Sequence, residues 1–311
     1  MNKISILGAG NVGSEVAYWC AIKELGNIVL WNRTKETAIG KALDLMESAP
    51  IARFNTRVKG TGNLKDTENS DIIVITLGIA RKAGMMREEL AGVNANIVRD
   101  IIKKTTKYSK GSILLIVTNP VDVMTYVAFK ASKFKRNRVF GLAGALDSSR
   151  FRYFISKELN ISIDEINALV IGSHGENMLP LPRFANVSGI PLFNLINNEK
   201  MRKLIKHTRE AGAEIIKLLG ANASFSVGAA IADSIEAILK DKRKIIPSSV
   251  YLNGEYSIRD CCMGVPVILG KNGVEKILEL RLNAEEKKAL NNAYKQIKSL
   301  INILNEKNKS T

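Results

Sequence analysis

The stretch KISILGAGNVG, residues 3–13, decides the fold of this chain. Residues 4–7 have the composition of a short buried strand, and a glycine-rich turn follows directly and opens a helix at Asn11. Gly8 permits the tight turn, Gly10 lets backbone amides approach a pyrophosphate, and Gly13 lets the helix pack close to the strand. The N-terminus of this helix favours the negative charge of the pyrophosphate. The stretch predicts a dinucleotide site with contacts from Gly8, Gly10, Asn11, Val12 and Gly13.

Strand-like and helical segments alternate along the first half of the chain. The expected strands are 4–7, 28–31, 71–76, 113–117 and 139–141, and the expected helices between them are 11–24, 37–46, 87–107 and 121–131. This alternation predicts an α/β fold with a doubly wound parallel sheet of the Rossmann type and right-handed crossovers. We expect the dinucleotide-binding domain to span residues 1–143.

The pattern changes in the second half, where helices come before strands. Expected helices are 148–159, 200–219 and 227–239, expected strands are 245–252 and 265–269, and a closing amphipathic helix covers 284–304, followed by a frayed polar tail at 305–311. This order predicts an α+β substrate domain at residues 144–311. No Pro-, Gly- or Ser-rich linker separates the halves, so we expect a tight interface with the site between them.

The chain is strongly basic, with 46 Lys and Arg against 30 Asp and Glu among 311 residues and a formal net charge of +16. The basic residues are spread along the chain and do not alternate with aromatic residues as in a stacking platform. We therefore expect no nucleic-acid partner, and we expect the positive field to favour a small anionic substrate.

Cysteine usage and hydropathy narrow the class of protein further. The three cysteines Cys20, Cys261 and Cys262 lack metal-ligand spacing, which predicts buried, reduced thiols and no metal site. No signal peptide and no run of about 18 apolar residues is present. We expect a cytoplasmic protein with no membrane partner.

The end of the second expected strand bears on cofactor choice. Asn32-Arg33-Thr34 stands where an acidic residue would bind the adenosine ribose hydroxyls. An amide, a guanidinium and a hydroxyl can bind a 2′-phosphate, which an aspartate would repel. We predict that NADP is accepted, and preferred over NAD if Arg33 faces the phosphate. If Arg33 points to solvent, either cofactor is used.

Four further segments carry polar side chains where strands end or loops begin. They are GIARKAGMMR at 78–87, VTNP at 117–120, LDSSR at 146–150 and GSHGE at 172–176. With these motifs, in this order, the chain resembles the lactate/malate dehydrogenase family from end to end, especially its lactate-dehydrogenase-like malate dehydrogenases of prokaryotes. The resemblance implies hydride transfer between a 2-hydroxy acid and a nicotinamide cofactor. Malate and oxaloacetate are the expected pair, and a lactate dehydrogenase or broad 2-keto-acid reductase is the alternative.

The reaction needs a base for the hydroxyl proton, and His174 has a near-neutral reference pKa. The second histidine, His207, lies in a Lys- and Arg-rich helix and is expected at the surface. The resemblance implies that Asp147 orients and stabilises the His174 imidazole. Arg150 follows three residues later, so both project from one face of a helix start, and its planar fork matches the substrate C1 carboxylate.

Residues 79–92 are bounded by glycines and rich in charge, which suits a mobile lid. The resemblance implies that Arg87 polarises the substrate carbonyl. Arg81 offers a partner for a second carboxylate, whereas lactate-type members of the family carry an uncharged side chain there. Since malate and oxaloacetate have that second carboxylate and lactate and pyruvate do not, Arg81 predicts a dicarboxylate substrate.

The remaining expected contacts are Asn119 to the substrate and the nicotinamide ribose, Ser224 (or Ala223) to the substrate, and Gly78, Asn94 and Val117 to the cofactor. Two positions depart from the family pattern. Asn32 stands where the family has an acidic residue, and Glu176 stands where aspartate is commoner. The resemblance implies a homotetramer, with a dimer as the alternative. The competing class is a non-catalytic module that binds a dinucleotide or RNA. Such a module does not need a proton relay, so the presence of His174 and Asp147 together argues against this class.

Overall fold

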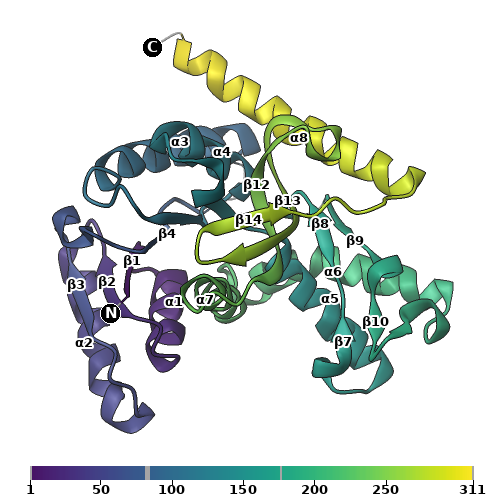
Figure 1. Cartoon of the computed structure of the whole chain (residues 1–311), viewed down its shortest axis with the longest axis horizontal. Helices are drawn as coiled ribbons and strands as arrows, with labels where there is room; N and C mark the ends of the chain where they lie inside the picture. Colours follow the sequence, from purple (N-terminus) through teal and green to yellow (C-terminus); the bar gives the residue numbers. More distant parts are fainter. Residues whose placement is uncertain (1, 81–84, 176, 310–311) are drawn as a thin grey trace.

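The computed structural model describes residues 2–80, 85–175 and 177–309. Strands from both halves of this described chain join one 11-stranded sheet, in the order β3-β2-β1-β4-β5-β6-β12-β13-β8-β9, with β14 paired to β13. The sheet forms the centre of the molecule, and helices lie on both of its faces (Figure 1).

Six strands of the first half run parallel and form a Rossmann sheet. They are β1 (Lys3–Leu7), β2 (Asn27–Trp31), β3 (Val58–Thr61), β4 (Ile72–Ile75), β5 (Ile113–Ile116) and β6 (Val139–Leu142). The central strands β4 and β5 contain only buried apolar residues, because helices cover both faces of the sheet. The order 3-2-1-4-5-6 reverses between β1 and β4, so the loops that follow these two strands flank the crevice where such folds bind ligands. The predicted fold class is confirmed.

Pairs of helices cover the two faces of the parallel sheet. Helices α1 (Asn11–Ile22) and α2 (Lys35–Ala52) lie on one face, and α3 (Arg87–Thr105) and α4 (Val121–Ser132) lie on the other (Figure 1). Each connects two parallel strands, as the alternation in the sequence predicted. In this arrangement the start of α1 directly follows the glycine-rich turn after β1.

The second half extends the same sheet with antiparallel strands. These are β12 (Lys244–Asn253), β13 (Arg259–Gly270), β14 (Gly273–Ile277), β8 (Val170–Gly172) and β9 (Met178–Pro180), while β7 (Ile166–Asn167), β10 (Asn186–Val187) and β11 (Ile190–Pro191) form a small separate sheet. The long helices are α5 (Gly144–Leu159), α6 (Asn198–Leu219), α7 (Phe225–Leu239) and α8 (Ala284–Lys309). None of the helices described here is both long and apolar enough to cross a membrane.

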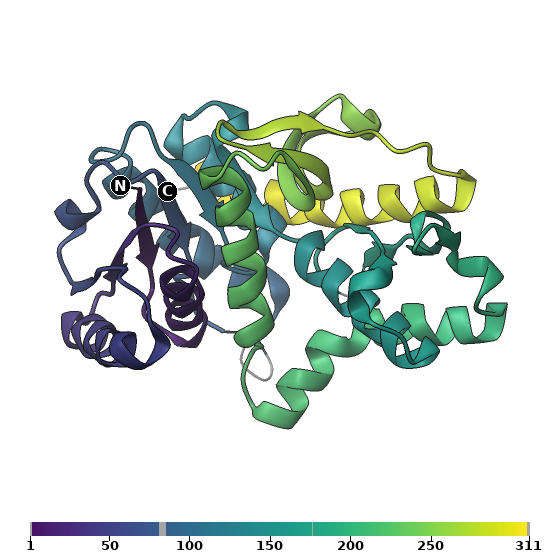
Figure 2. The ribbon, with the colours of Figure 1, turned by 60° about the horizontal axis from the view of Figure 1, so that its bottom comes forward.

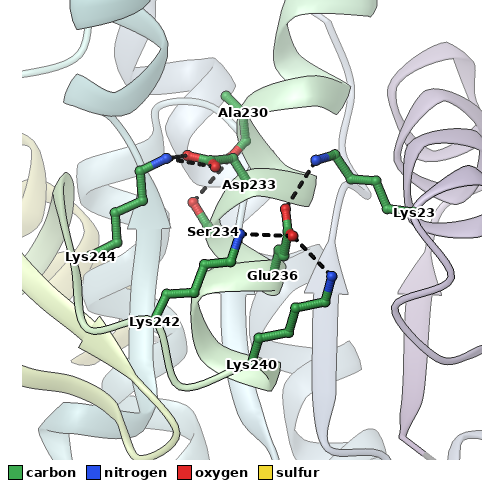
Figure 3. A network of polar contacts seen from close by, with 8 residues as sticks. All are labelled: Lys23, Ala230, Asp233, Ser234, Glu236, Lys240, Lys242 and Lys244. Carbon is green, nitrogen blue, oxygen red and sulfur yellow. Dashed lines mark hydrogen bonds and ion pairs between the residues drawn. The ribbon is translucent and has the colours of Figure 1, made fainter.

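Helix α7 links the halves, since it packs along α1 (Figure 2). At the contact Gly228 lies where a Cβ would come within 2.7 Å of Glu15. Near the other end of α7, Glu236 accepts hydrogen bonds from Lys23, which directly follows α1, at 2.9 Å, from Lys240 at 3.0 Å and from Lys242 at 2.8 Å (Figure 3). Mainly the bonds from Lys242 and Lys23 lower the pKa of Glu236 to about 2. This network fixes the C-terminal end of α7 to the dinucleotide-binding half.

One strand was not predicted, and two local expectations were wrong. Residues 58–61 form the edge strand β3, which sequence periodicity did not indicate because its four residues, VKGT, show no apolar alternation. Helix α2 continues past residue 46 to Ala52, with Pro50 in its last turn. The tail was expected to be frayed from residue 305. Instead helix α8 continues past its buried residues Ile301 and Leu304 and ends at Lys309. The three cysteines are buried and His207 is exposed, as expected.

Candidate active site

The structure places His174 and Asp147 against each other. His174 lies in the loop after β8, and Asp147 is in the first turn of α5. The Nδ1 atom of His174 lies 2.8 Å from Oδ2 of Asp147, whose side chain is 1% exposed. A carboxylate only accepts, so Nδ1 carries the hydrogen and donates it. The neutral ring therefore keeps Nε2 as a proton acceptor.

The surroundings of His174 raise its pKa above the ordinary value of 6.5. Burial by itself would lower the pKa, because it disfavours the charged imidazolium. The negative charge and hydrogen bond of Asp147 act in the opposite direction and outweigh burial, with a further contribution from Asp122, while Arg150 lowers the pKa. The site thus holds a histidine that can carry a proton near neutral pH.

Arg150 binds the carboxylate of Asp147 as well. Its Nη1 donates to Oδ1 of Asp147 at 3.2 Å, and its side chain is only 13% exposed. The Nε atom of Arg150 is buried and has no hydrogen-bond partner among the residues described. Gly212 of α6 faces the guanidinium, where a Cβ would lie 3.4 Å from Nη1. A buried guanidinium with an unused donor is suited to an anionic ligand.

A pocket opens in front of His174, and its wall comes from three parts of the fold. Arg87 at the start of α3 and Asn119 after β5 line it together with His174. Helix α8 closes the far side with apolar and amide side chains, Gln296, Ile297 and Leu300. Asn177 donates to Gln296 and so joins the histidine loop to α8. Sequence reasoning missed this wall, because nothing in the pattern of a closing helix shows which turn faces a site.

The residues around Asn94 tie together the loops after β4 and β5. Its Oδ1 accepts from the backbone N–H of Ile79 at 2.9 Å, and its Nδ2 donates to the carbonyls of Ile79 at 3.2 Å and Asn119 at 2.8 Å. Gly78 has φ +152°, and a Cβ there would lie 2.7 Å from Thr118 and 3.0 Å from Asn94 Oδ1. Asn94, Gly78 and Asn119 therefore meet at the carboxyl edge of the sheet, as does Val117, which directly follows β5.

The turn after β1 fits a dinucleotide pyrophosphate. Gly8 has φ +119°, and a side chain there would clash with Thr76. A side chain at Gly13 would clash with the carbonyl of Gly8, whereas Gly10 faces open space. No side chain caps the N-terminus of α1. Its first backbone N–H groups, from Asn11 and Val12 onward, are therefore available to an anion.

The end of β2 also lies at this edge. Asn32 is half-buried and donates from Nδ2 to the carbonyl of Thr34 at 3.2 Å. Arg33 and Thr34 are exposed, and the Thr34 hydroxyl does not cap α2. Residues 32–34 therefore present an amide, a guanidinium and a hydroxyl at this edge of the sheet. Within the part of the chain described, no three His, Cys, Asp or Glu side chains gather to hold a metal ion.

Of the predicted substrate contacts within the described residues, neither Arg150 nor Ser224 is among the residues that line the pocket with His174. Ser224 is half-buried and forms the N-cap position of α7, next to Ala223, which packs against the core. Arg81 and Glu176 lie outside the described residues. The structure adds Asp122, a buried carboxyl in α4 that accepts a hydrogen bond from the His174 backbone N–H. An acidic residue inside the apolar run VDVMTYVAF was the signal in the sequence.

A glycine-rich turn at the switch point of a Rossmann sheet, together with a buried histidine that can carry a proton, is typical of the class of dinucleotide-dependent oxidoreductases. Residues 2–141 match the NAD-binding domain of the lactate/malate dehydrogenases, and residues 144–308 match the α/β C-terminal domain of the same family. The chain belongs to the lactate/malate dehydrogenase family.

Individual relatives agree with this placement. The chain is 47% identical over 300 residues to a malate dehydrogenase of Desulforudis audaxviator, covering 96% of this chain and 97% of that protein. A solved malate dehydrogenase structure from Salinibacter ruber has a TM-score of 0.95 and 41% identity, covering 99% and 100%. A lactate dehydrogenase of Eimeria maxima, solved with NADH and oxamate, has a TM-score of 0.94 and 36% identity, covering 98% and 95%.

Proposed function

We propose that this chain catalyses the reversible interconversion of malate and oxaloacetate with a nicotinamide dinucleotide. The hydrogen-bonded series His174–Asp147–Arg150 carries the proposal, because it joins a proton carrier to a buried guanidinium through one carboxylate. The relatives named malate dehydrogenase support the same reaction.

The residues of the site act on the substrate as follows. Arg150 binds the C1 carboxylate through its planar fork and so orients C2. The Nε2 atom of His174 accepts the C2 hydroxyl proton in malate oxidation and returns it in oxaloacetate reduction, while Asp147 stabilises the imidazolium. Arg87 polarises the C2 oxygen, and Asn119 contacts the substrate. When bound, the dinucleotide supplies the nicotinamide ring that takes or gives the hydride.

Choice of substrate is assigned to Arg81, which binds the C4 carboxylate of malate or oxaloacetate. An unpaired guanidinium in a closed site is costly, so a substrate without the second carboxylate is rejected.

The turn after β1 holds the pyrophosphate of the cofactor through Gly8, Gly10, Asn11, Val12 and Gly13. The nicotinamide half of the cofactor lies along Gly78, Asn94, Val117 and Asn119. We propose that NADP(H) is accepted as well as NAD(H). Asn32, Arg33 and Thr34 support this, because they offer donors to a 2′-phosphate and no carboxylate to repel it.

The proposed assembly is a homotetramer of chains, each with a dinucleotide-binding domain at 1–143 and a substrate domain at 144–311. Exposed apolar side chains on α2, such as Leu43 and Ile51, and on α6, such as Leu218 and Leu219, support self-association. Light scattering coupled to gel filtration should give four times the 34.2 kDa of one chain. A mass of 34.2 kDa that persists at high protein concentration would contradict any oligomer.

The reaction is tested by absorbance at 340 nm with NADH or NADPH and either oxaloacetate or pyruvate, for the wild type and Arg81→Gln. We expect kcat/KM for oxaloacetate to exceed that for pyruvate by about a thousandfold or more, and Arg81→Gln to remove most of this preference. Equal or faster pyruvate reduction by the wild type would leave a 2-hydroxy-acid dehydrogenase but refute malate as its substrate.

A further inference from the structure

The buried carboxyl of Asp122 has no role in the mechanism above. It is the second residue of α4, only 3% exposed, and follows Asn119 by three residues in the sequence. Its two oxygens have different partners: Oδ2 accepts from the backbone N–H of His174 at 3.0 Å, and Oδ1 accepts from the Ser249 hydroxyl at 2.7 Å. Asp122 therefore holds the main chain of the histidine loop from the dinucleotide-binding half.

The anchor for this carboxyl is built into the sheet. Ser249 of β12 is fully buried and pairs in register with Gly141 of β6. A Cβ at Gly141 would clash with Thr125 Oγ1 and would lie 3.2 Å from Ser249 Cβ. The missing side chain therefore lets α4 approach β6 and β12 closely enough for Asp122 to reach Ser249.

The backbone bond to Asp122 fixes the position of the His174 ring. Asp147 holds the ring at Nδ1, but one hydrogen bond allows the ring to swing about the carboxylate oxygen. A second bond at the His174 backbone N–H fixes the chain from which the side chain projects. The two bonds come from different elements, α5 and α4, so the histidine is held from both halves of the molecule.

We propose that Asp122, anchored by Ser249, is a positioning residue that keeps His174 in place against Asp147. The role of His174 as proton carrier belongs to the proposed function, and the positioning role rests on it. In this role Asp122 acts on the reaction through His174 and the loop that carries it.

Asp122 also affects the pKa of His174 through its charge. The groups that face His174 are Asp147 and Arg150 from α5, Asp122 from α4, and Arg87 in the shared pocket. Burial raises the pKa of Asp122 to about 6, although hydrogen bonds from Ser249, the His174 backbone and the Ser173 side chain, together with the charge of His174, lower it. The buried thiols of Cys261 and Cys262 in β13 stay protonated, because burial raises their pKa. Ionised Asp122 in turn raises the pKa of His174.

Two substitutions separate the anchor from the charge. Asparagine at 122 can still accept from the His174 N–H with Oδ1 and donate from Nδ2 to the Ser249 oxygen, so it keeps both bonds and loses only the charge. Alanine loses both the bonds and the charge. Ser249→Ala removes the anchor alone, and it serves if Asp122→Ala fails to fold. Ser248→Ala is the matched control, because Ser248 is buried on the same strand and, among the described residues, its hydroxyl donates to the carbonyl of Ile246, at 3.3 Å, and does not contact Asp122.

The kinetic test is the split between kcat and KM. We expect Asp122→Ala to lower kcat about 10- to 100-fold and Ser249→Ala about 3- to 10-fold, because a displaced base reacts slowly. The KM of the dinucleotide should stay within about twofold in both, since the turn after β1 is untouched. Asp122→Asn and Ser248→Ala should keep kcat within about threefold. Equal losses in Asp122→Asn and Asp122→Ala, or no loss in either, would overturn the positioning role.

Two measurements do not depend on turnover. Hydrogen exchange in residues 171–175 should be faster in Asp122→Ala and Ser249→Ala than in the wild type, Asp122→Asn and Ser248→Ala. The chain has only two histidines, so the imidazole of His174 can be titrated by NMR with exposed His207 as reference. Asp122→Asn should move the titration of His174 to lower pH and leave His207 unchanged. If exchange and titration change as expected but the wild type has no dehydrogenase activity, the proposed function is refuted and the contact between Asp122 and His174 is supported. Unchanged exchange in both anchor variants refutes the inference whatever the activity.

Discussion

Asp147 meets His174, which lies 27 residues further along the chain, through a hydrogen bond of 2.8 Å from Nδ1 to Oδ2. The same carboxylate accepts from Arg150 at its other oxygen. One buried acidic side chain therefore sets both the proton affinity of the histidine and the orientation of the guanidinium. Its removal should affect proton transfer and substrate binding together.

Asp147→Asn should lower kcat for malate oxidation at least about 100-fold, because an amide cannot stabilise the imidazolium. KM for the substrate should rise as well, since Arg150 loses its ionic partner. Steady-state kinetics in both directions would measure these effects. Retention of kcat within about threefold would show that the carboxylate does not support the proton transfer.

The direction of the reaction sets the sign of its pH dependence. Malate oxidation needs neutral His174 and should slow as pH falls through the pKa of this residue, which lies above 6.5. Oxaloacetate reduction needs the protonated ring and should slow as pH rises through the same pKa. In profiles of kcat/KM against pH, Asp147→Asn should shift both limbs to lower pH. A limb that does not move would mean that another group titrates.

Arg150→Lys keeps the charge but loses the planar fork. We expect kcat/KM for oxaloacetate to fall about 100-fold, because an ammonium cannot bind a carboxylate in bidentate fashion. Arg152→Lys is the matched control on the same helix, since Arg152 donates from Nη2 to the carbonyl of Ile163. Equal effects of the two substitutions would point to a general loss of α5 packing.

Asn32→Asp should change cofactor use without changing the chemistry. A carboxylate at the end of β2 accepts hydrogen bonds from ribose hydroxyls and repels a 2′-phosphate. We expect the ratio of kcat/KM for NADPH to that for NADH to fall at least about tenfold. Arg33→Ala should lower the same ratio by removing a phosphate partner. A wild type that prefers NADH strongly, and whose ratio neither substitution changes, would contradict the assignment of Arg33.

The Glu236 network should contribute to stability in a defined pH range. The pKa of Glu236 is about 2 against an ordinary 4.5, so its contribution is complete above 4.5 and is lost as pH falls towards 2. The three lysines are partly exposed, which screens the pairs. Glu236→Gln should therefore lower the free energy of unfolding at pH 7 by about 1–2 kcal/mol. Urea unfolding at several pH values would measure the difference.

Glu199→Gln is the control for this prediction. Glu199 pairs with Lys203 one turn away on α6 at 2.8 Å, and both side chains are about two-thirds exposed, at 70% and 67%. Its removal should leave the free energy of unfolding almost unchanged. A destabilisation by Glu236→Gln that is equally large at pH 3 and pH 7 would show that packing, and not charge, holds α7 to α1.

The local pattern of the sequence was enough for the sheet of the first half and for the glycine turn. Strands β4 and β5 are continuous apolar runs, and β1 is apolar except for Lys3 and Ser5. The helices between these strands have clear periodicity, so propensity and burial agree. Edge strand β3 has no such signal, because only its pairing with β2 makes it a strand. Strand β14 and the short strands of the second half were missed for the same reason.

The sequence by itself determined the chemical groups of the site: a glycine turn for phosphate, two histidines of which one follows a strand, and Asp147 and Arg150 three residues apart on one helix. These are local features, so short-range geometry is sufficient to recognise them. Only the tertiary structure decided that Ser249, 127 residues from Asp122, completes a buried anchor for His174, and that α8 closes the pocket. Such contacts depend on how strands align and helices pack across the whole sheet, which no local pattern encodes.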